Sequence, residues 1–214
     1  MHLYNNTSEE GFELAYELGC KKLAGMDLEE ICRKSGAQYV NRDRIIINYL
    51  TRPYLITLPE VEISLNDNDD EEKVPIKDRI LILHYLTRAT GAPFTNKLIT
   101  YGQIEGGKFY CPVFVRRNLD PILNCFGDKP EALIEVSKKM GGERSHYGDV
   151  SICINVFPMV RIFIIIWKGD DQVPHGGNIL FDDNIKNYLA SEDVCVLTEI
   201  LTWKLINLAK TSSS

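Results

Sequence analysis

Apolar side chains recur at helical spacing in several parts of the chain, most clearly near its C-terminal end. Between residues 193 and 209, apolar positions follow one another three or four residues apart, as on one face of an amphipathic helix. The other helices that this pattern predicts cover residues 8–18, 28–35, 76–90, 112–126 and 131–139. Ser8 and Asp27 are the expected N-terminal caps of the first two helices. Gly36 is expected to end the second, because glycine readily adopts the left-handed conformation.

Runs of β-branched and aromatic residues predict strands in two groups. The first group covers residues 44–49, 54–57 and 61–65, and the second covers residues 150–156 and 160–167, which we expect to form a hairpin. Helices and strands are segregated along the chain instead of alternating, which is typical of an α+β fold. We therefore predict a single α+β domain over residues 1–214, with a mainly antiparallel sheet packed against several helices.

Charge and hydropathy narrow the classes of partner. The 214 residues carry a net charge of −6, and the pI is about 5.3. Nucleic acids and anionic membranes both require a basic surface, and the basic residues here are scattered, so neither partner is expected. The most apolar stretch, residues 150–167, is interrupted by Pro158 and Arg161, which indicates two strands instead of a membrane span. The N-terminal residues lack the features of a signal peptide, so a cytoplasmic protein is expected.

The sequence does not contain a complete metal-binding or catalytic motif of a known type. Residues 66–72, NDNDDEE, lack the glycine and the terminal glutamate of an EF-hand calcium loop, so we expect a solvated loop. None of the six cysteines belongs to a CxxC pair, and most have apolar neighbours, so we expect reduced, buried thiols. The chain also has no GxSxG, GxGxxG, HExxH or phosphate-loop motif, so no motif by itself names a reaction.

Two histidines are candidate ligands for a metal or a cofactor. His175 precedes Gly176 and Gly177, and glycine permits the backbone to approach a ligand closely. We expect these residues in a turn-rich loop that follows Trp167, whose indole would add aromatic surface to a cofactor pocket. The alternative for His175 is an exposed loop histidine. His84 lies among apolar residues of a predicted helix, and is either a core side chain or a second candidate ligand.

Four aspartates close to this loop in sequence are candidate metal ligands or acid–base groups. They are Asp149, Asp170, Asp171 and Asp182. Carboxylates bind hard cations, and paired carboxylates do acid–base chemistry when their environments separate their pKa values. The spacing of these four residues fits no specific motif, and aspartate is also common in turns and at helix caps. Both hypotheses remain open on the sequence alone.

Two longer segments carry a resemblance to a known family. They are ILILHYLTRATGAPFTNKLITYGQIEGGKFY and GDVSICINVFPMVRIFIIIWKGDDQVPHGGNILFDDNIKNYLASED. In the order and spacing of their motifs they resemble an uncharacterised prokaryotic family of domains of unknown function, found in anaerobic bacteria and archaea. His84 lies in the LHYL motif of that pattern, whereas the family more often has a small residue at the position of His175.

That resemblance implies a setting in anaerobic metabolism. Some members look fused to a four-iron–four-sulphur domain like that of corrinoid iron–sulphur proteins, although this chain has no run of four cysteines. The resemblance also implies a cofactor-binding protein that holds a corrinoid such as cobalamin, or heme, through a histidine axial ligand. The usual DxHxxG motif of corrinoid proteins is absent. The expected partners are a tetrapyrrole or other small-molecule cofactor, and a methyltransferase or another metalloenzyme. The alternatives are a carboxylate- or metal-dependent enzyme and an accessory protein for metalloenzyme assembly.

Overall fold

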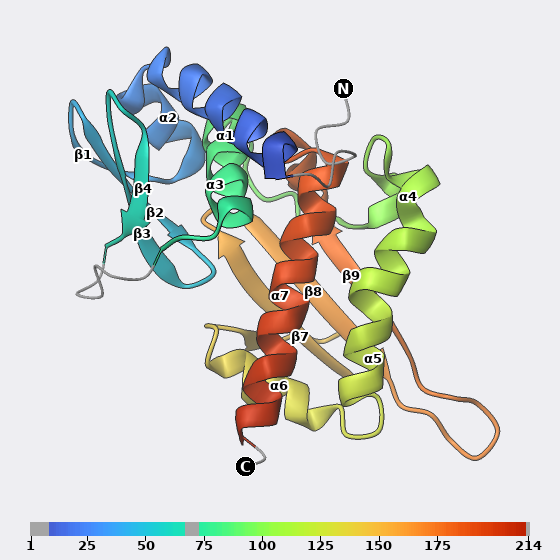
Figure 1. Cartoon of the computed structure of the whole chain (residues 1–214). Helices are drawn as coiled ribbons and strands as arrows, with labels where there is room; N and C mark the ends of the chain where they lie inside the picture. Colours follow the sequence, from blue (N-terminus) through green and yellow to red (C-terminus); the bar gives the residue numbers. More distant parts are fainter. Residues whose placement is uncertain (1–8, 67–72, 213–214) are drawn as a thin grey trace.

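Four consecutive strands form an antiparallel sheet in the first third of the chain (Figure 1). In the computed structural model, which describes residues 9–66 and 73–212, these strands are β1 (Gln38–Asn41), β2 (Arg44–Tyr49), β3 (Arg52–Thr57) and β4 (Glu62–Leu65). They pair in the order β1-β2-β3-β4. Ile45 and Ile47 of β2 are fully buried, as the two-residue period of a strand with one covered face requires. The three strands predicted here are confirmed, and the exposed strand β1 is additional.

A second antiparallel sheet is built mostly from the C-terminal half. Its strands are β5 (Leu98–Thr100), β6 (Glu143–Arg144), β7 (Val150–Phe157), β8 (Val160–Trp167) and β9 (Gly176–Asp182), in the order β5-β9-β8-β7-β6. The predicted hairpin is confirmed as β7 and β8. The expectation that Gly176 and Gly177 belong to a loop was wrong, because they pair with Trp167 and Ile166. The ladder between β8 and β9 runs from Ile162 to Trp167, the last residue of β8.

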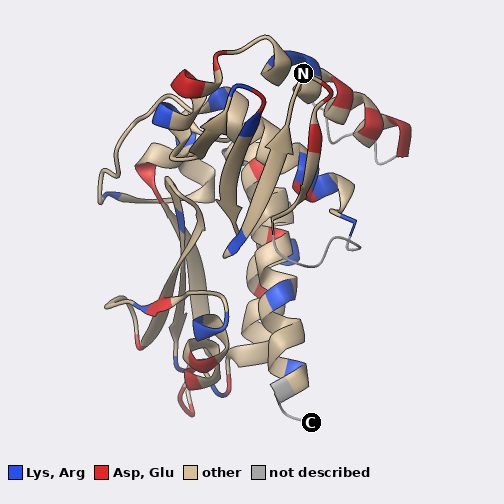
Figure 2. Ribbon diagram, turned by 90° about the vertical axis from the view of Figure 1, so that its left-hand side faces the viewer, with Lys and Arg blue, Asp and Glu red and all other residues tan. Residues whose placement is uncertain are grey.

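Helices pack beside both sheets. They are α1 (Glu9–Ala24), α2 (Leu28–Ser35), α3 (Ile76–Arg88), α4 (Gly107–Phe114), α5 (Asp120–Phe126), α6 (Glu131–Lys138) and α7 (Ser191–Ser212). Short helical turns, η1 (Tyr101–Gln103), η2 (Val115–Leu119) and η3 (Asp183–Asn187), join other elements. Figures 1 and 2 show α5 and α7 on one face of the five-stranded sheet. None of the described helices is both long and apolar enough to cross a membrane. The predicted α+β class, with antiparallel sheets packed against several helices, is confirmed.

Local capping signals in the sequence predicted one helix to the residue. The side chain of Asp27 accepts a hydrogen bond from the Glu29 amide at 3.0 Å, and Gly36 has a φ of 74° at the C-terminal end of α2. The cap expected at Ser8, and the segment 66–72 apart from Asn66, lie outside the described residues. A cap of this kind is detectable in sequence because it depends on neighbouring residues alone.

Helix α4 departs from the expected start at Pro112. It begins at Gly107, after Gly106 with a φ of 78°, so that Pro112 lies inside the helix. Proline has no N–H to donate, which removes one hydrogen bond of the regular ladder. The wider π-helical turn η2 follows, before α5 begins at Asp120.

Aromatic rings join the two sheets into one core. Tyr49 of β2 stacks on Phe157 of β7 at 4.8 Å between ring centroids, and Phe157 stacks on Tyr85 of α3 at 4.1 Å. Tyr85 in turn stacks on Tyr188 at 5.5 Å. These rings belong to one continuous cluster of buried apolar residues. Offset aromatic stacking adds about 0.5–1.5 kcal/mol per pair beyond the burial of area, so this column ties the N-terminal sheet to the C-terminal one.

The six cysteines are unpaired, as expected, but their burial differs from the prediction. Cys32 and Cys195 are buried, whereas Cys125 is exposed on the short helix α5. Burial raises the pKa of the Cys32 and Cys153 thiols to about 11. These thiols are therefore protonated at neutral pH and behave as small apolar side chains.

Candidate functional site

His84 of α3 meets Asp193 at the start of α7, although 109 positions separate them in the sequence. The imidazole Nδ1 lies 2.7 Å from Oδ1 of Asp193. The Asp193 side chain is 3 % exposed and the His84 side chain 15 % exposed. The second carboxylate oxygen, Oδ2, accepts a hydrogen bond from the Ala190 amide at 3.3 Å, which fixes the carboxylate at the beginning of the helix. A buried, positioned carboxylate therefore sets the orientation of the imidazole.

The start of α7 is itself held by the segment that leads into α4. The Tyr101 hydroxyl donates to the Ser191 carbonyl oxygen at 3.1 Å. A Cβ added at Gly106 would lie 3.0 Å from the Ser191 hydroxyl oxygen, and the positive φ at Gly106 disfavours any side chain. Close contact at this point fixes the start of α7, two residues before Asp193. The sequence did not reveal Asp193 as a partner, because an acidic residue in the first turn of a helix is common.

His175 lies at the other end of β9 from Asp182, in the loop between β8 and β9. Its Nδ1 is 3.6 Å from Oδ1 of Asp128, which is too long for a hydrogen bond, and the Asp128 side chain is 95 % exposed. The ring packs on Gly127, where an added Cβ would lie 2.4 Å from Nε2. A hollow of about 400 Å³ beside it is lined by residues that include Asp170 and Lys168. The imidazole is thus packed against the end of α5, and its contact with Asp128 is too long to orient it.

The other proposed cofactor contacts have different surroundings. Trp167 is 45 % exposed at the end of β8. Gly177 is enclosed: an added Cβ would lie 2.7 Å from the Ile165 carbonyl oxygen and 2.9 Å from Cδ2 of Leu123 on α5. Gly176 has no atom within 4 Å of the same position. Gly177 therefore allows α5 to pack closely on β9, which accounts for this glycine by packing alone.

The structure gives three of the four candidate carboxylates a place at the β8–β9 loop. Oδ2 of Asp149 accepts the Lys168 amide at 2.8 Å, and Oδ1 of Asp170 accepts the amides of Gln172 and Val173, both at 2.8 Å. These backbone hydrogen bonds lower the pKa of Asp170. Asp171 is exposed in the same loop. Within residues 9–66 and 73–212, no three His, Cys, Asp or Glu side chains gather as a group able to hold a metal ion.

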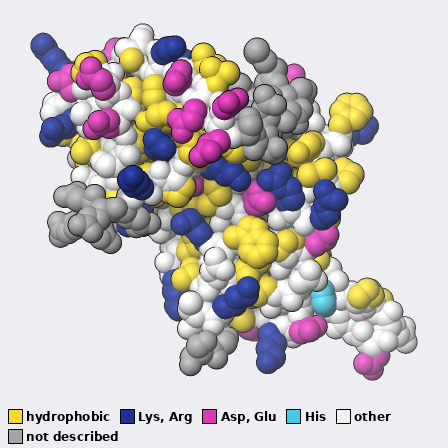
Figure 3. Space-filling model, viewed as in Figure 1, with side chains coloured by type: hydrophobic (Ala, Val, Ile, Leu, Met, Phe, Trp, Pro, Cys, Tyr) yellow, Lys and Arg dark blue, Asp and Glu magenta, His cyan; other side chains and the backbone are white. Residues whose placement is uncertain are grey.

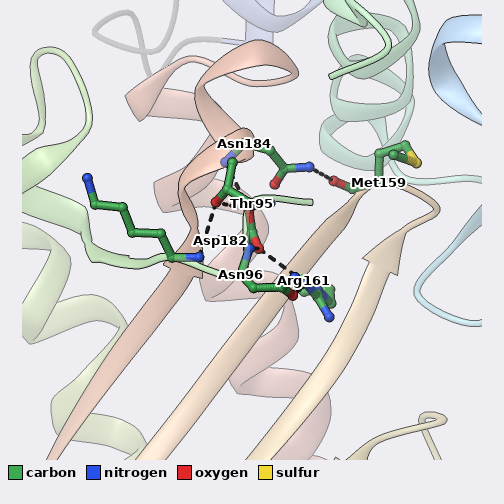
Figure 4. Close-up of polar contacts among 7 residues, drawn as sticks. Thr95, Asn96, Met159, Arg161, Asp182 and Asn184 are labelled. Atoms are coloured by element: carbon green, nitrogen blue, oxygen red, sulfur yellow. Dashed lines mark hydrogen bonds and ion pairs between the residues drawn. The ribbon is translucent and has the colours of Figure 1, made fainter. Parts of the chain in front are cut away.

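Asp182, the fourth carboxylate, is fully buried at the end of β9 (Figure 4). Its oxygens accept hydrogen bonds from the Thr95 amide and hydroxyl and from the amides of Asn96 and Asn184, at 2.8 to 3.1 Å. Nη2 of Arg161 adds a contact at 3.2 Å. Burial by itself would raise the pKa of Asp182, but the hydrogen bonds from these groups outweigh it and lower the pKa. Asp182 thus joins the segment before β5 to strands β8 and β9.

An exposed apolar surface on α4 was not foreseen. Phe109 is 93 % exposed and Tyr110 is 40 % exposed. Figure 3 shows hydrophobic side chains at the surface over this helix, at the upper right. When the sequence GKFYCPVF is placed on a helix, apolar residues lie on all of its sides. The sequence pattern therefore does not distinguish a buried face from an exposed one.

The geometry can be set beside the comparison with known families. The model of a family described as a domain of unknown function (DUF3786) matches residues 27–203, which include both His84 and Asp193. The chain belongs to this family. The resemblance noted in the sequence is therefore confirmed at the level of the DUF3786 family, whereas a fusion to an iron–sulphur domain is not shown. No curated protein and no solved structure matches the chain.

Proposed function

We propose that this member of the DUF3786 family binds a corrinoid or heme, whose metal Nε2 of His84 would hold. The observation that carries the proposal is the contact of 2.7 Å between Nδ1 of His84 and the buried carboxylate of Asp193. Histidines that ligate a metal usually donate the other ring N–H to a carboxylate or a carbonyl group, which fixes the tautomer and raises the basicity of the ligating nitrogen. The contact between Nδ1 of His84 and Asp193 is of this kind, and Nε2 would then be the ligating atom.

Burial strengthens the case for His84 over His175. The Asp193 carboxylate is almost completely shielded from water, so its attraction for the imidazole N–H is weakly screened. His175, in contrast, faces a carboxylate that is 95 % exposed and 3.6 Å away. A histidine side chain that is oriented before the cofactor binds loses less conformational entropy on binding, and the affinity for the cofactor is correspondingly higher. The donor chemistry of His84 and Asp193 fits an imidazole-ligated metal centre, and that of His175 fits it less well.

The roles of the two residues follow from this geometry. Asp193 holds the proton on Nδ1 of His84 and keeps the ring in one orientation. The N-terminal end of α7 holds Asp193 through the Ala190 amide. A bound corrinoid or heme would supply group-transfer or redox chemistry at its metal. Under this proposal the protein partner is a methyltransferase or another metalloenzyme that exchanges a group or an electron with the cofactor.

Visible absorption spectra of the purified full chain test the proposal. The protein is prepared without oxygen and titrated separately with hydroxocobalamin and hemin. We expect a saturable shift of the visible bands. His84→Ala should abolish it, and Asp193→Asn should weaken the binding about 10–100-fold, the usual effect of removing the group that orients a ligand.

His175→Ala is the matched control, because it removes an imidazole from the other candidate position. It should leave the titration unchanged. Loss of the spectral shift in His175→Ala, with binding retained in His84→Ala, would place the ligand in the β8–β9 loop and refute the assignment to His84. If the wild-type chain binds neither compound, an accessory role in metalloenzyme assembly replaces this proposal.

A further inference from the structure

A hollow on the face of the five-stranded sheet opposite α5 and α7 contains an arginine between aromatic rings. Its lining residues are Asn96, Leu98, Ser145, His146, Tyr147, Arg161 and Phe163, and its volume is about 290 Å³. We propose that this hollow binds a small organic carboxylate with an apolar or aromatic body, and that Arg161 recognises the carboxylate. The proposal involves none of the residues assigned to the cofactor, so it is independent of the proposed function.

Strand alternation places the arginine on this face. Ile162 and Ile164 of β8 are fully buried in the core, on the side where α5 and α7 pack. Arg161 and Phe163, which alternate with them, therefore point to the opposite side of the sheet. The Arg161 side chain remains 23 % exposed, so a ligand in the hollow can reach it.

The guanidinium of Arg161 is held before any ligand binds. Its central carbon lies 3.8 Å from the ring centroid of Phe94 and 5.9 Å from that of Phe163. Nη2 donates to Oδ1 of Asn96 at 3.0 Å and to Oδ2 of Asp182 at 3.2 Å (Figure 4). Among the described residues these are its hydrogen bonds, and Nε is enclosed without a partner. A planar guanidinium that is held in place, with further N–H groups able to donate hydrogen bonds, is well suited to bind a carboxylate.

Asp182 accepts most of its hydrogen bonds from groups other than Arg161. Four shorter hydrogen bonds, from Thr95, Asn96 and Asn184, already occupy its oxygens. Three of these bonds are on Oδ1, so the contact with Arg161 at 3.2 Å takes the second acceptor position of Oδ2, beside the Asn96 amide. Asn96 adopts a φ of 57°, in the left-handed region, and presents its Oδ1 to the arginine. This hydrogen bond helps to orient the guanidinium.

The opposite wall of the hollow is a loop fixed to the sheet. Gly148 has a φ of 60°, and a Cβ there would lie 2.6 Å from Cγ2 of Ile165, so the loop crosses the strand in close contact. The Tyr147 amide donates to the Ser151 hydroxyl at 3.0 Å. The Tyr147 ring meets that of Phe163 edge to face, with centroids 6.0 Å apart and an angle of 86°. These two rings give an apolar or aromatic group a surface to pack on.

Size and charge select the class of ligand. A volume of about 290 Å³ lies just below the usual range for ligand pockets, roughly 300–1,000 Å³, so the ligand is small. Arg161 supplies positive charge, and the carboxylate of Asp182 beside it offsets part of that charge. The site therefore favours a monoanion over a dianionic phosphate. A carboxylate on a flat apolar group meets both the charge and the aromatic walls.

Benzoate is a suitable probe, with benzamide as its neutral analogue and inorganic phosphate as the dianion. The experiment records backbone amide NMR spectra of the full chain during each titration. We expect benzoate to shift the amide signals of residues around the hollow in a saturable way, and benzamide and phosphate to bind at least about tenfold more weakly. Benzamide that binds as well as benzoate, or shifts confined to another part of the chain, would overturn the proposal.

Variants separate the role of Arg161 from a general effect of charge. Arg161→Gln should weaken benzoate binding about tenfold or more, whereas Arg144→Gln, an exposed arginine on the same sheet, should leave it unchanged. Equal effects of the two substitutions would refute recognition by Arg161. If thermal unfolding shows that Arg161→Gln is not folded, Tyr147→Ala decides instead, because this side chain is 44 % exposed and lies outside the network of Asp182. Unchanged affinity in Tyr147→Ala would then overturn the proposal.

Discussion

Replacing Gly177 with alanine tests how closely α5 packs on the second sheet. The new methyl group would lie 2.7 Å from the Ile165 carbonyl oxygen, 2.9 Å from Cδ2 of Leu123 and 3.3 Å from Cδ1 of Leu119. The leucine side chains can rotate, but the carbonyl oxygen belongs to the neighbouring strand β8 and cannot move without distorting the ladder. We expect the strand or the helix to shift, at a cost of about 1–3 kcal/mol.

Gly176 provides the matched control, since it precedes Gly177 in the same strand. An added Cβ there meets no atom within 4 Å. Gly176→Ala should therefore be neutral or stabilise the protein by about 0.4–1 kcal/mol, because alanine restricts the unfolded chain more than glycine does. The two variants should differ by about 1–4 kcal/mol in the free energy of unfolding. For a chain of this size, that difference corresponds to about 2–16 °C in Tm.

Urea unfolding followed by circular dichroism measures both variants against the wild type. Similar slopes in urea for the three proteins would show that the difference lies in the folded state. The same samples, titrated with hydroxocobalamin or hemin, distinguish packing from ligand contact at this position. Two variants equal in stability to within about 0.5 kcal/mol would refute the packing of α5 on Gly177, because an overpacked contact costs more than that.

Three further predictions concern stability and thiol reactivity. Asp182→Asn should lower the free energy of unfolding by roughly 3 kcal/mol at neutral pH, because the amide brings donors into a site already filled with donors. The pKa of Asp182 is lowered in the folded state, so its contribution is present above the unfolded-state pKa of about 3.9 and is lost as the pH falls through the lower folded-state value. Urea titrations of wild type and variant should therefore converge in acid, and a gap that stays constant would contradict this account. Leu201→Ala on α7 removes a fully buried side chain and should cost roughly 2–5 kcal/mol in chemical unfolding, so a loss under about 0.5 kcal/mol would show that this face does not pack on the core. All six thiols should react with a thiol reagent in urea, and Cys32 and Cys153 should react slowly in the native protein because burial raises the pKa of each to about 11. A count of four or fewer in urea would contradict the unpaired state.

Elements with local signals were predictable, and elements made by distant partners were not. Helix α2 has a cap at each end, and strands β7 and β8 are long apolar runs joined by a short turn. Strand β5 has three residues and exists because it pairs with β9 far along the chain. All four residues of strand β1 are exposed, and β1 pairs with β2 at the edge of the first sheet. Neither short strand has an alternation that can be distinguished from a loop.

In the candidate site, too, features with a local sequence signal were predictable, and those that depend on a distant partner were not. His84 and His175 were both plausible ligands by residue type, and the sequence around His175 was the more suggestive because of its glycines. The packing of α5 explains Gly177 without a ligand, whereas the environment of His84 is decided by Asp193 on another helix. No periodicity connects two residues on separate helices, so this pairing requires the tertiary structure. Arg161 was likewise considered only as an interruption of an apolar run.

The strand order of the second sheet has a consequence for biosynthesis. On the ribosome, β1 to β4 can pair once Leu65 has emerged, because every ladder of that sheet joins neighbours in sequence. Strand β5 has to wait for β9, since Leu98 pairs with Asp182 and the same carboxylate holds Thr95 and Asn96. Until β9 is made, β8 keeps an open apolar edge, which is a template for pairing with other chains. A nascent chain paused before Gly176 should therefore have a complete first sheet and an incomplete second sheet that can pair with other chains. We expect chaperone binding to matter most at that stage.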